Sequence, residues 1–210
     1  FDLCICDPPY GIGECSGREQ SRHQSKGRAM TPVRYAVKGW DKEPPPPEYF
    51  TELRRVSVNQ IVWGANHFIS RLPFDSPAWL VWDKHNSGDV ADCELAWTSF
   101  DSAVRKFRYR WNGMLQEDMA NKERRIHPTQ KPVALYRWLL QNYAKPGQRI
   151  LDTHLGSGSI AIACDIEGFD LTLCELDPDY FAAGKKRLEQ HQAQPRLFDA
   201  PAPQPIQLTL

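Results

Sequence analysis

Short apolar runs alternate with amphipathic stretches along most of the chain, a pattern that predicts an α/β domain with a mostly parallel sheet and crossover helices. The expected strands are Phe1–Asp7, Gln60–Trp63, Trp79–Trp82, Val104–Tyr109, Arg149–Asp152 and Asp170–Cys174. The expected helices are Pro47–Val56, Pro132–Tyr143, Ser157–Glu167 and Pro178–Gln192, the last capped by Asp177. These elements predict a single domain over residues 1–192.

Three segments interrupt the alternation. Residues 11–46 and about 110–131 are polar and charged, and insertions of this length are typical of functional loops. Residues 193–210 contain four prolines, so a disordered tail is expected there.

Acidic and basic residues balance at 26 each in 210 residues, so any nucleic-acid contact has to come from local patches. No apolar run approaches membrane-spanning length. Phe1 lies directly in an expected strand, so a leading segment is expected before it. The cysteines form no Cys-x-x-Cys pair, which favours reduced thiols in a cytoplasmic compartment and no metal site; they are Cys4, Cys6, Cys15, Cys93, Cys164 and Cys174.

The tetrapeptide Asp7-Pro8-Pro9-Tyr10 directly follows the first expected strand. An exocyclic amine of a nucleobase is a poor nucleophile because its lone pair is delocalised, and two hydrogen-bond acceptors would free that lone pair. The Asp7 carboxylate and the Pro8 carbonyl can be these acceptors, since two prolines fix the backbone. Tyr10 offers a ring on which a flipped base can stack. A plain proline turn is the simpler alternative when the tetrapeptide is taken alone.

A glycine-containing turn, Asp152-Thr153-His154-Leu155-Gly156-Ser157-Gly158, follows a later strand and opens a helix. Glycines there let the backbone approach a ligand, and the amino end of a helix favours a carboxylate. Glu175 ends the next strand, where an acid can bind two ribose hydroxyls. A tight strand-to-helix turn explains the glycines alone, but the acid at the neighbouring strand end favours a ligand site.

A third motif, His127-Pro128-Thr129-Gln130-Lys131-Pro132, precedes this turn. In their order, the three motifs resemble the permuted beta class of DNA amino methyltransferases that use S-adenosylmethionine. The likeness spans about residues 1–190. It departs at Thr153 and His154, where family members often carry Pro and Phe.

The resemblance implies a Rossmann-like class I methyltransferase fold with a circularly permuted motif order and an antiparallel hairpin near Trp79–Tyr109. It implies site-specific methyl transfer from S-adenosylmethionine to adenine N6 in double-stranded DNA by base flipping. An Asp-first tetrapeptide is usual for adenine in this family, whereas a Ser-first version is commoner for cytosine N4. Cytosine-N4 methylation and a catalytically silent DNA-binding relic remain alternatives. An oxidoreductase could account for the glycine-containing turn, but it would assign no role to the tetrapeptide Asp7-Pro8-Pro9-Tyr10.

The resemblance also assigns residues. The catalytic set is Asp7, Pro8, Pro9 and Tyr10. Thr129 and Lys131 are expected to meet the donor carboxylate and Asp152 its ammonium group, while His154 packs beside the donor. The full donor-binding set is Asp7, His127, Thr129, Gln130, Lys131, Asp152, His154, Leu155, Gly156, Ser157, Gly158, Glu175 and Leu176.

Two further segments, Val62–Phe68 and Val81–Lys84, resemble family segments at strand ends. Asn66, His67 and Asp83 are expected to line the flipped-base pocket. The tryptophans of these segments, Trp63 and Trp82, are expected in the core.

Basic residues concentrate in the two insertions, where a DNA backbone contact is expected. The predicted DNA-binding residues are Arg18, Arg22, Lys26, Arg28, Arg108, Arg110, Arg124 and Arg125, with Arg34, Lys38, Arg105, Lys106 and Lys122 nearby. A solvated charged face is the simpler alternative for either patch. The slot between the catalytic and donor halves, about residues 110–126, is short for a recognition segment, which predicts a homodimer.

The tail peptide Gln194-Pro195-Arg196-Leu197-Phe198 resembles short Gln-x-x-Leu-Phe peptides that dock on the bacterial sliding clamp. Packing of Leu197 and Phe198 on the domain or on a dimer partner is the simpler alternative. A bacterial or phage protein in the cytoplasm, near the nucleoid and with or without a restriction partner, fits these expectations.

Neutralising Arg22, Lys26 and Arg28 together should weaken DNA binding and flatten its salt dependence, because fewer counterions are released. Each lost phosphate contact should reduce the slope of log affinity against log salt by about 1. Titrations at several salt concentrations measure this slope, and an unchanged slope would contradict a phosphate-binding role for this loop.

Overall fold

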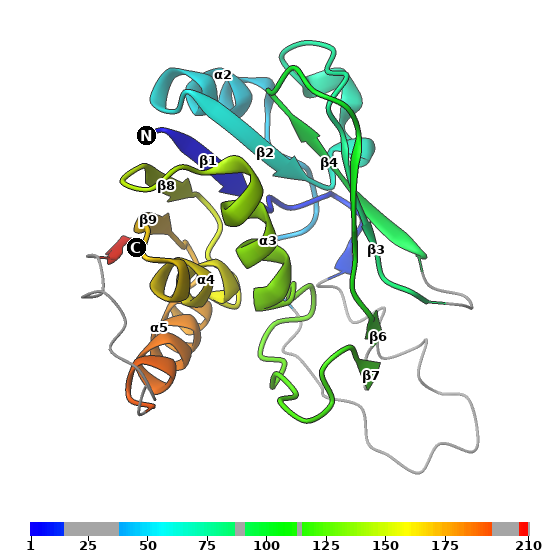
Figure 1. Cartoon of the computed structure of the whole chain (residues 1–210). Coiled ribbons are helices and arrows are strands. Elements are labelled where there is room, and N and C mark those ends of the chain that lie inside the picture. Colours follow the sequence, from blue (N-terminus) through cyan, green and yellow to red (C-terminus); the bar gives the residue numbers. More distant parts are fainter. Residues whose placement is uncertain (15–37, 87–90, 113–114, 195–205, 210) are drawn as a thin grey trace.

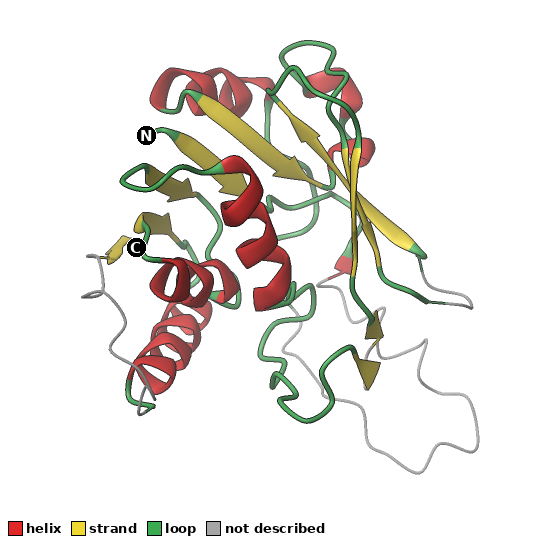
Figure 2. Cartoon of the chain, in the orientation of Figure 1, coloured by secondary structure: helices red, strands yellow, loops and turns green. Residues whose placement is uncertain are grey.

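The computed structural model describes residues 1–14, 38–86, 91–112, 115–194 and 206–209. An eight-stranded sheet runs through it in the order β10-β9-β8-β1-β2-β4-β3-β5 (Figures 1 and 2). Its strands are β1 Leu3–Cys6, β2 Asn59–Trp63, β3 Leu80–Asp83, β4 Cys93–Thr98, β5 Arg105–Arg108, β8 Arg149–Asp152, β9 Asp170–Cys174 and β10 Ile206–Thr209. A two-stranded sheet is formed by β6 (Trp111–Asn112) and β7 (Leu115–Gln116).

Strand β1 lies at the centre of the large sheet and is buried on both faces, as expected for a parallel strand covered by helices. Leu3 and Ile5 face the cluster built by helices α3 (Val133–Tyr143) and α4 (Ser159–Glu167). Cys4 and Cys6 face the opposite cluster, which includes Phe50 and Leu53 of helix α2 (Pro47–Val56). Helix α5 (Pro178–Gln192) packs beside α4, completing the cover of the donor half (Figure 1).

The order of the strands confirms the permuted α/β fold predicted from the sequence. The first strand of the chain, β1, lies between β2 and the late strand β8, so the amino-terminal and carboxyl-terminal halves meet at the centre of the sheet. In the large sheet β4 is antiparallel to both of its neighbours, and the other strand pairs are parallel. The carboxyl ends of those strands and the beginning of β4 therefore share one edge, here called the carboxyl edge.

The antiparallel hairpin expected near Trp79–Tyr109 is present, but its strands differ from expectation. Strand β4, which the sequence analysis did not identify, pairs antiparallel with both β2 and β3. The expected strand near Val104–Tyr109 forms as β5 and runs parallel to β3. The two tryptophans expected in the core are there, because the exposed fractions of Trp63 and Trp82 are 0% and 1%.

The expectation of a disordered tail over residues 193–210 is wrong at its end. Ile206–Thr209 form β10, which pairs parallel with β9 and so covers a backbone edge that would otherwise be free. Residues 195–198 of the clamp-like peptide lie outside the described residues, so the clamp contact stays a prediction.

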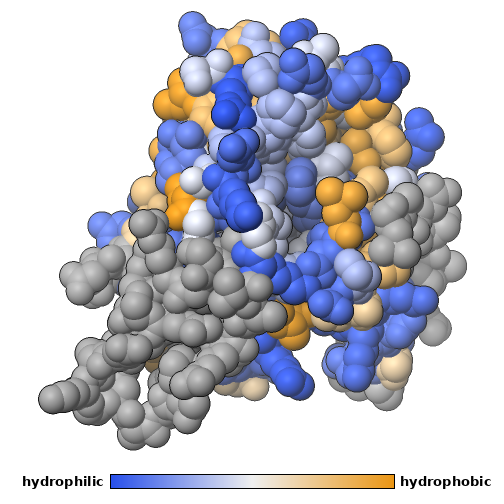
Figure 3. All heavy atoms as spheres, turned by 180° about the vertical axis from the view of Figure 1, so that it is seen from behind, coloured by the Kyte–Doolittle hydropathy of each residue, from blue (hydrophilic) through white to orange (hydrophobic). Residues whose placement is uncertain are grey.

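Several large apolar side chains are exposed on the described surface, for example Val58, Ile69 and Val104. Figure 3 shows the rear face with mixed polar and apolar residues and its hydrophobic residues in small separate groups. Scattered apolar residues are ordinary on a protein surface, so this face does not identify a dimer interface. Among the described helices none is long and apolar enough to cross a membrane.

Candidate active site

Four acidic residues meet at the carboxyl edge from four different strands. Asp7 follows β1, Asp152 ends β8, Glu175 follows β9, and Glu94 lies near the start of the antiparallel strand β4. In open α/β sheets, ligands bind at this edge. The topology therefore brings the catalytic tetrapeptide and the glycine turn, which are more than a hundred residues apart, into one site.

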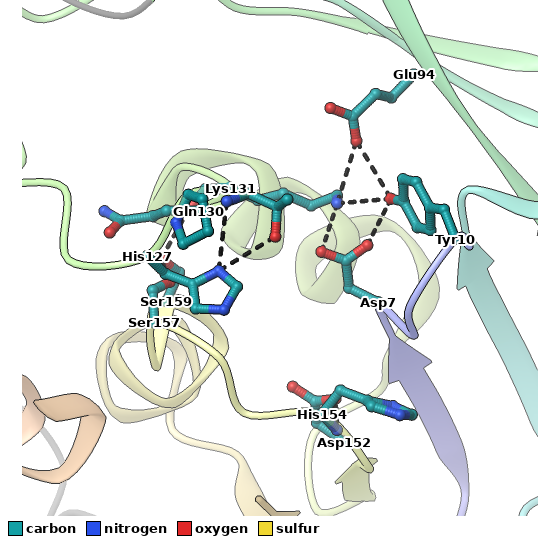
Figure 4. A network of polar contacts seen from close by, with 12 residues as sticks. Asp7, Tyr10, Glu94, His127, Gln130, Lys131, Asp152, His154, Ser157 and Ser159 are labelled. Carbon is teal, nitrogen blue, oxygen red and sulfur yellow. Dashed lines mark hydrogen bonds and ion pairs between the residues drawn. The ribbon is translucent and has the colours of Figure 1, made fainter. Parts of the chain in front are cut away.

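The Asp7 carboxylate is held by two side chains of the site (Figure 4). The Lys131 ammonium lies 2.5 Å from Asp7 Oδ2, and the Tyr10 hydroxyl donates to Asp7 Oδ1 at 2.6 Å. Lys131 also donates to the Tyr10 hydroxyl at 2.9 Å. The side chain of Lys131 is only 1% exposed, so this ion pair is shielded from solvent.

Glu94 shares the Lys131 ammonium with Asp7. Its Oε2 lies 3.1 Å from Lys131 Nζ, while its Oε1 lies 2.5 Å from Lys84 Nζ. Burial would raise the pKa of Glu94, but the charges of Lys131 and Lys84 outweigh burial and lower that pKa to about 2. Glu94 therefore carries a negative charge at every pH near neutrality.

The pKa values of Asp7 and Lys131 are shifted by the same contacts with each other and with Glu94. Burial raises the pKa of Asp7 above its usual range, and the neighbouring Lys131 charge opposes that rise. Burial would lower the pKa of Lys131, but Asp7 and Glu94 outweigh it and raise that pKa. Lys131 is thus a permanent cation whose charge favours the ionised, hydrogen-bond-accepting form of Asp7.

Tyr10 is fixed both by its ring and by its backbone. Its ring stacks on His67 with centroids 5.2 Å apart and planes 17° apart. Gly64, at φ 69°, lies beneath the ring, where a Cβ atom would come within 2.0 Å of Tyr10 Cε1. The buried Asp41 carboxylate accepts the backbone N–H groups of Tyr10 and Gly11 at 2.7 and 2.8 Å.

The glycine turn is held by Glu175. Its Oε2 accepts the N–H of Gly156 at 3.0 Å and its Oε1 accepts the N–H of Asp177 at 2.9 Å. Gly158 has φ 72°, and a Cβ there would lie 3.2 Å from the Gly184 carbonyl, so the turn meets α5 closely. Leu176, beside Glu175, is 95% exposed, which leaves an apolar side chain available to an aromatic ligand.

The buried carboxyl group of Asp152 has a raised pKa, which makes this edge suitable for a cationic ligand. Burial, together with the carboxylates of Asp7 and Glu175, raises the pKa of Asp152 to about 7, although the His154 N–H donates to it at 2.9 Å. A ligand that brings positive charge here would stabilise the ionised carboxylate. S-adenosylmethionine carries both a sulfonium and an ammonium group, so the residues present fit it.

Thr153 and His154, the positions that depart from the family pattern, connect the glycine turn to α2. Thr153 Oγ1 lies 2.7 Å from the Tyr49 hydroxyl and 2.9 Å from His154 Nδ1. The His154 ring meets Tyr49 edge-on at 5.7 Å, and burial lowers the pKa of His154 to about 4. His154 is therefore a neutral residue that packs against Tyr49, and its expected contact with the donor stays a prediction.

The His127–Pro132 motif differs from expectation in where its side chains are directed. The Lys131 ammonium contacts Asp7 and not the glycine turn, because the buried carboxylates of the catalytic half attract it. The Gln130 amide is used within its own loop, where Oε1 accepts the Ile126 N–H at 2.9 Å. Thr129 bonds to His127 Nδ1 through both its N–H and its hydroxyl, at 3.3 and 3.1 Å.

His127 itself lies next to the glycine turn. A Cβ on Gly156 would be 3.9 Å from its ring, and the ring packs against Tyr180 of α5 at 4.3 Å. Burial, assisted by Lys131, lowers the pKa of His127 to about 3, so the ring is neutral. Two residues of the turn face inward, since Leu155 is buried against Gly184 and Ser157 Oγ lies 3.0 Å from Ser159 Oγ.

Four of the eight predicted DNA-binding residues lie outside the described residues, namely Arg18, Arg22, Lys26 and Arg28. Of the others, Arg108 and Arg124 are exposed. Arg110 lies 3.2 Å from His85 Nδ1, and Arg125 donates to the Pro128 carbonyl, which gives Arg125 a structural contact. Arg108 also lies 3.9 Å from Asp83, so its charge is partly paired.

Several residues of the site were not identified from the sequence. Glu94 and Asp41 were missed because their partners, Lys131 and Tyr10, lie far along the chain, and Lys84 was missed because its partner is Glu94. The carboxyl end of the first insertion is tied to α5, where the Lys38 ammonium lies 2.6 Å from Asp177. Arg187 of α5 donates to the Ser157 carbonyl at 2.9 Å and pairs with Glu123 at 2.6 Å, joining the glycine turn to the second insertion.

Comparisons with known proteins agree with this geometry. Residues 81–186, half of the chain, match the N6/N4 family described as DNA methylase, and the chain belongs to that family. A type II methyltransferase of Haemophilus parainfluenzae, M.HpaI, is 33% identical over 69 residues, which are 33% of this chain and 22% of that protein. The chain thus spans less than a third of the curated relatives that it matches.

Solved structures share the fold. The M1.HpyAVI–SAM complex has a TM-score of 0.52 and 21% identity, covering 89% of this chain and 88% of that one. The PvuII DNA methyltransferase, described as cytosine-N4-specific, has a TM-score of 0.52 and 11% identity, covering 95% and 81%. At these identities the likeness supports the class I methyltransferase fold.

Replacing Lys131 by Met should raise the pKa of Asp7 further, because burial then acts without the opposing charge. The ionised fraction of Asp7 at a given pH should therefore fall. Carbon-13 NMR of the aspartate carboxyl groups measures the titration. Lys185→Met, at an exposed pair with Glu189, is the matched control, and an Asp7 titration that is the same in Lys131→Met and wild type would contradict the coupling.

Proposed function

We propose that the chain is a DNA amino methyltransferase that methylates adenine N6 in double-stranded DNA with S-adenosylmethionine as donor. The observation that carries this proposal is the position of the Asp7 carboxylate at the carboxyl edge, on the strand next to the one that leads into the glycine turn. An amine acceptor and a cationic donor can therefore meet there. The Asp-first tetrapeptide favours adenine over cytosine.

The residues of the catalytic half act on the amine. Asp7 accepts a hydrogen of the amino group, and the Pro8 carbonyl accepts the other, which localises the nitrogen lone pair. Tyr10, whose ring already stacks on His67, supports the flipped base. On methyl transfer the amino nitrogen would bond to the methyl carbon while the bond from that carbon to the donor sulfur breaks, and the electron pair of that bond would go to the sulfur. The Asp7 carboxylate is the nearest proposed acceptor for the proton that the nitrogen then releases.

The residues of the donor half hold and orient the methyl donor. S-adenosylmethionine supplies an electrophilic methyl group when bound. Glu175 is proposed to bind the ribose hydroxyls and Leu176 to contact the adenine ring, while Asp152 meets the positive charge. His127 and the backbone of Gly156–Gly158 would form the wall of this site, and the Lys38–Asp177 ion pair borders it.

DNA contact is proposed for the exposed Arg108 at the end of β5 and Arg124 of the second insertion, together with Arg110 and the basic residues of the first insertion. The short recognition slot supports a homodimer in which two subunits read the site together.

Asp7→Ala should reduce methyl transfer about 100-fold or more, because it removes an acceptor needed in the transition state. Donor and DNA affinities should change little. Transfer of a labelled methyl group to DNA measures the rate, and activity within a few-fold of wild type would rule out the assigned role. Identifying the modified base after DNA hydrolysis decides between N6-methyladenine, as proposed, and N4-methylcytosine.

Glu175→Ala should weaken S-adenosylmethionine binding roughly 10-fold or more, the scale of a hydrogen bond to a charged group. The same change removes the acceptor for the Gly156 N–H, which adds to the loss. Calorimetric titration of the donor gives the affinity, and DNA binding is the control. An unchanged donor affinity would exclude Glu175 from the site.

A further inference from the structure

Every donor of the Lys131 ammonium already has a partner. Its three neighbours are Asp7 Oδ2 at 2.5 Å, the Tyr10 hydroxyl at 2.9 Å and Glu94 Oε2 at 3.1 Å (Figure 4). Asp7 is equally committed, because its second oxygen accepts from Tyr10 at 2.6 Å. A carboxylate oxygen can accept more than one hydrogen bond, but an amino group that takes the position of the Lys131 ammonium on Asp7 Oδ2 has to displace it.

A buried ammonium that loses a carboxylate partner is costly unless a second carboxylate remains. Glu94 provides that second carboxylate, from a strand that carries none of the sequence motifs. It is fixed on its other side, where Oε1 lies 2.5 Å from Lys84 Nζ. Lys84 Nζ in turn lies 5.0 Å from the centroid of the ring of Trp82, a buried residue of β3.

We propose that Glu94 is a positioning residue: it retains the Lys131 ammonium when the target amino group takes the place of that ammonium on Asp7. The inference rests on the proposed function, since it concerns the entry of an exocyclic amine of DNA. In the structure Lys131 contacts Asp7 Oδ2, the atom to which the amine is proposed to bind, and Glu94 is a second carboxylate partner that can keep Lys131 in the site.

The charges of the cluster suit such an exchange. Two carboxylates, Asp7 and Glu94, face two ammonium groups, Lys131 and Lys84, so the cluster is neutral. A neutral amine entering at Asp7 leaves that balance unchanged. The tyrosine hydroxyl is already bonded to both Lys131 and Asp7, so it can follow either partner over a short distance.

The test uses the whole chain in a methyl-transfer assay with double-stranded DNA. Glu94→Gln keeps the size of the side chain but removes its charge, so Lys131 has Asp7 as its single carboxylate partner and competes more strongly with the amine. The kcat should fall about 10-fold, the effect expected for one hydrogen bond to a charged group, with unchanged donor affinity. Glu52→Gln, at an exposed pair with Arg55, is the matched control and should keep wild-type kcat.

The distinguishing result comes from the double variant. Adding Lys131→Met to Glu94→Gln removes the competitor, so kcat should rise above that of Glu94→Gln, when both are assayed at a pH where the carboxyl titration shows Asp7 ionised. A merely structural role of Glu94 would leave the double variant as slow or slower. If Glu94→Gln does not fold, Glu94→Asp replaces it: this change keeps the charge but shortens the side chain, which moves the carboxylate away from Lys131, so a smaller fall in kcat and the same reversal on adding Lys131→Met are expected.

Two results would overturn the inference: an unchanged kcat in Glu94→Gln, or a double variant no faster than Glu94→Gln. Either can occur while the wild-type protein methylates DNA, in which case the proposed function survives without this role for Glu94. A wild-type protein that transfers no methyl group from S-adenosylmethionine to DNA would overturn both.

Discussion

The buried ion pair between Lys131 and Asp7 is the interaction on which the site depends. Burial alone would favour the protonated form of Asp7, which is a weaker hydrogen-bond acceptor than the carboxylate. The Lys131 charge, 2.5 Å away, favours the ionised form. The same contact joins the segment after β1 to the segment that leads into α3. It therefore connects the amino-terminal and carboxyl-terminal halves of the chain.

The topology makes this pairing possible. Strand β1 lies between β2 and β8, so β1 and β8 are neighbours in the sheet. The tetrapeptide follows β1 and the glycine turn begins at the end of β8, so both lie at the carboxyl edge. The antiparallel strand β4 contributes its beginning to the same edge, which brings Glu94 to Lys131. Arg187 and Lys38 then tie the two insertions to α5, beside the glycine turn.

Local patterns were sufficient to predict the helices α2 and α5 and the strands β8 and β9 at their observed limits, because capping residues, glycines and apolar runs are properties of neighbouring residues. The direction of the Lys131 side chain was not predictable in this way, since its partner Tyr10 is 121 positions distant and the choice depends on burial. Strand β4 was missed because Glu94 and Thr98 dilute its apolar pattern. Strand β10 was missed because its pairing with β9, and not its proline-rich surroundings, gives it order.

The most direct measurement is a crystal structure of the protein with double-stranded DNA and a non-reactive donor analogue. The account predicts a flipped adenine whose amino nitrogen lies within hydrogen-bond distance of Asp7 and of the Pro8 carbonyl, with Lys131 Nζ on Glu94. A flipped base whose amino group lies away from Asp7, or a Lys131 ammonium that remains on Asp7 Oδ2 while the base is bound, would contradict it.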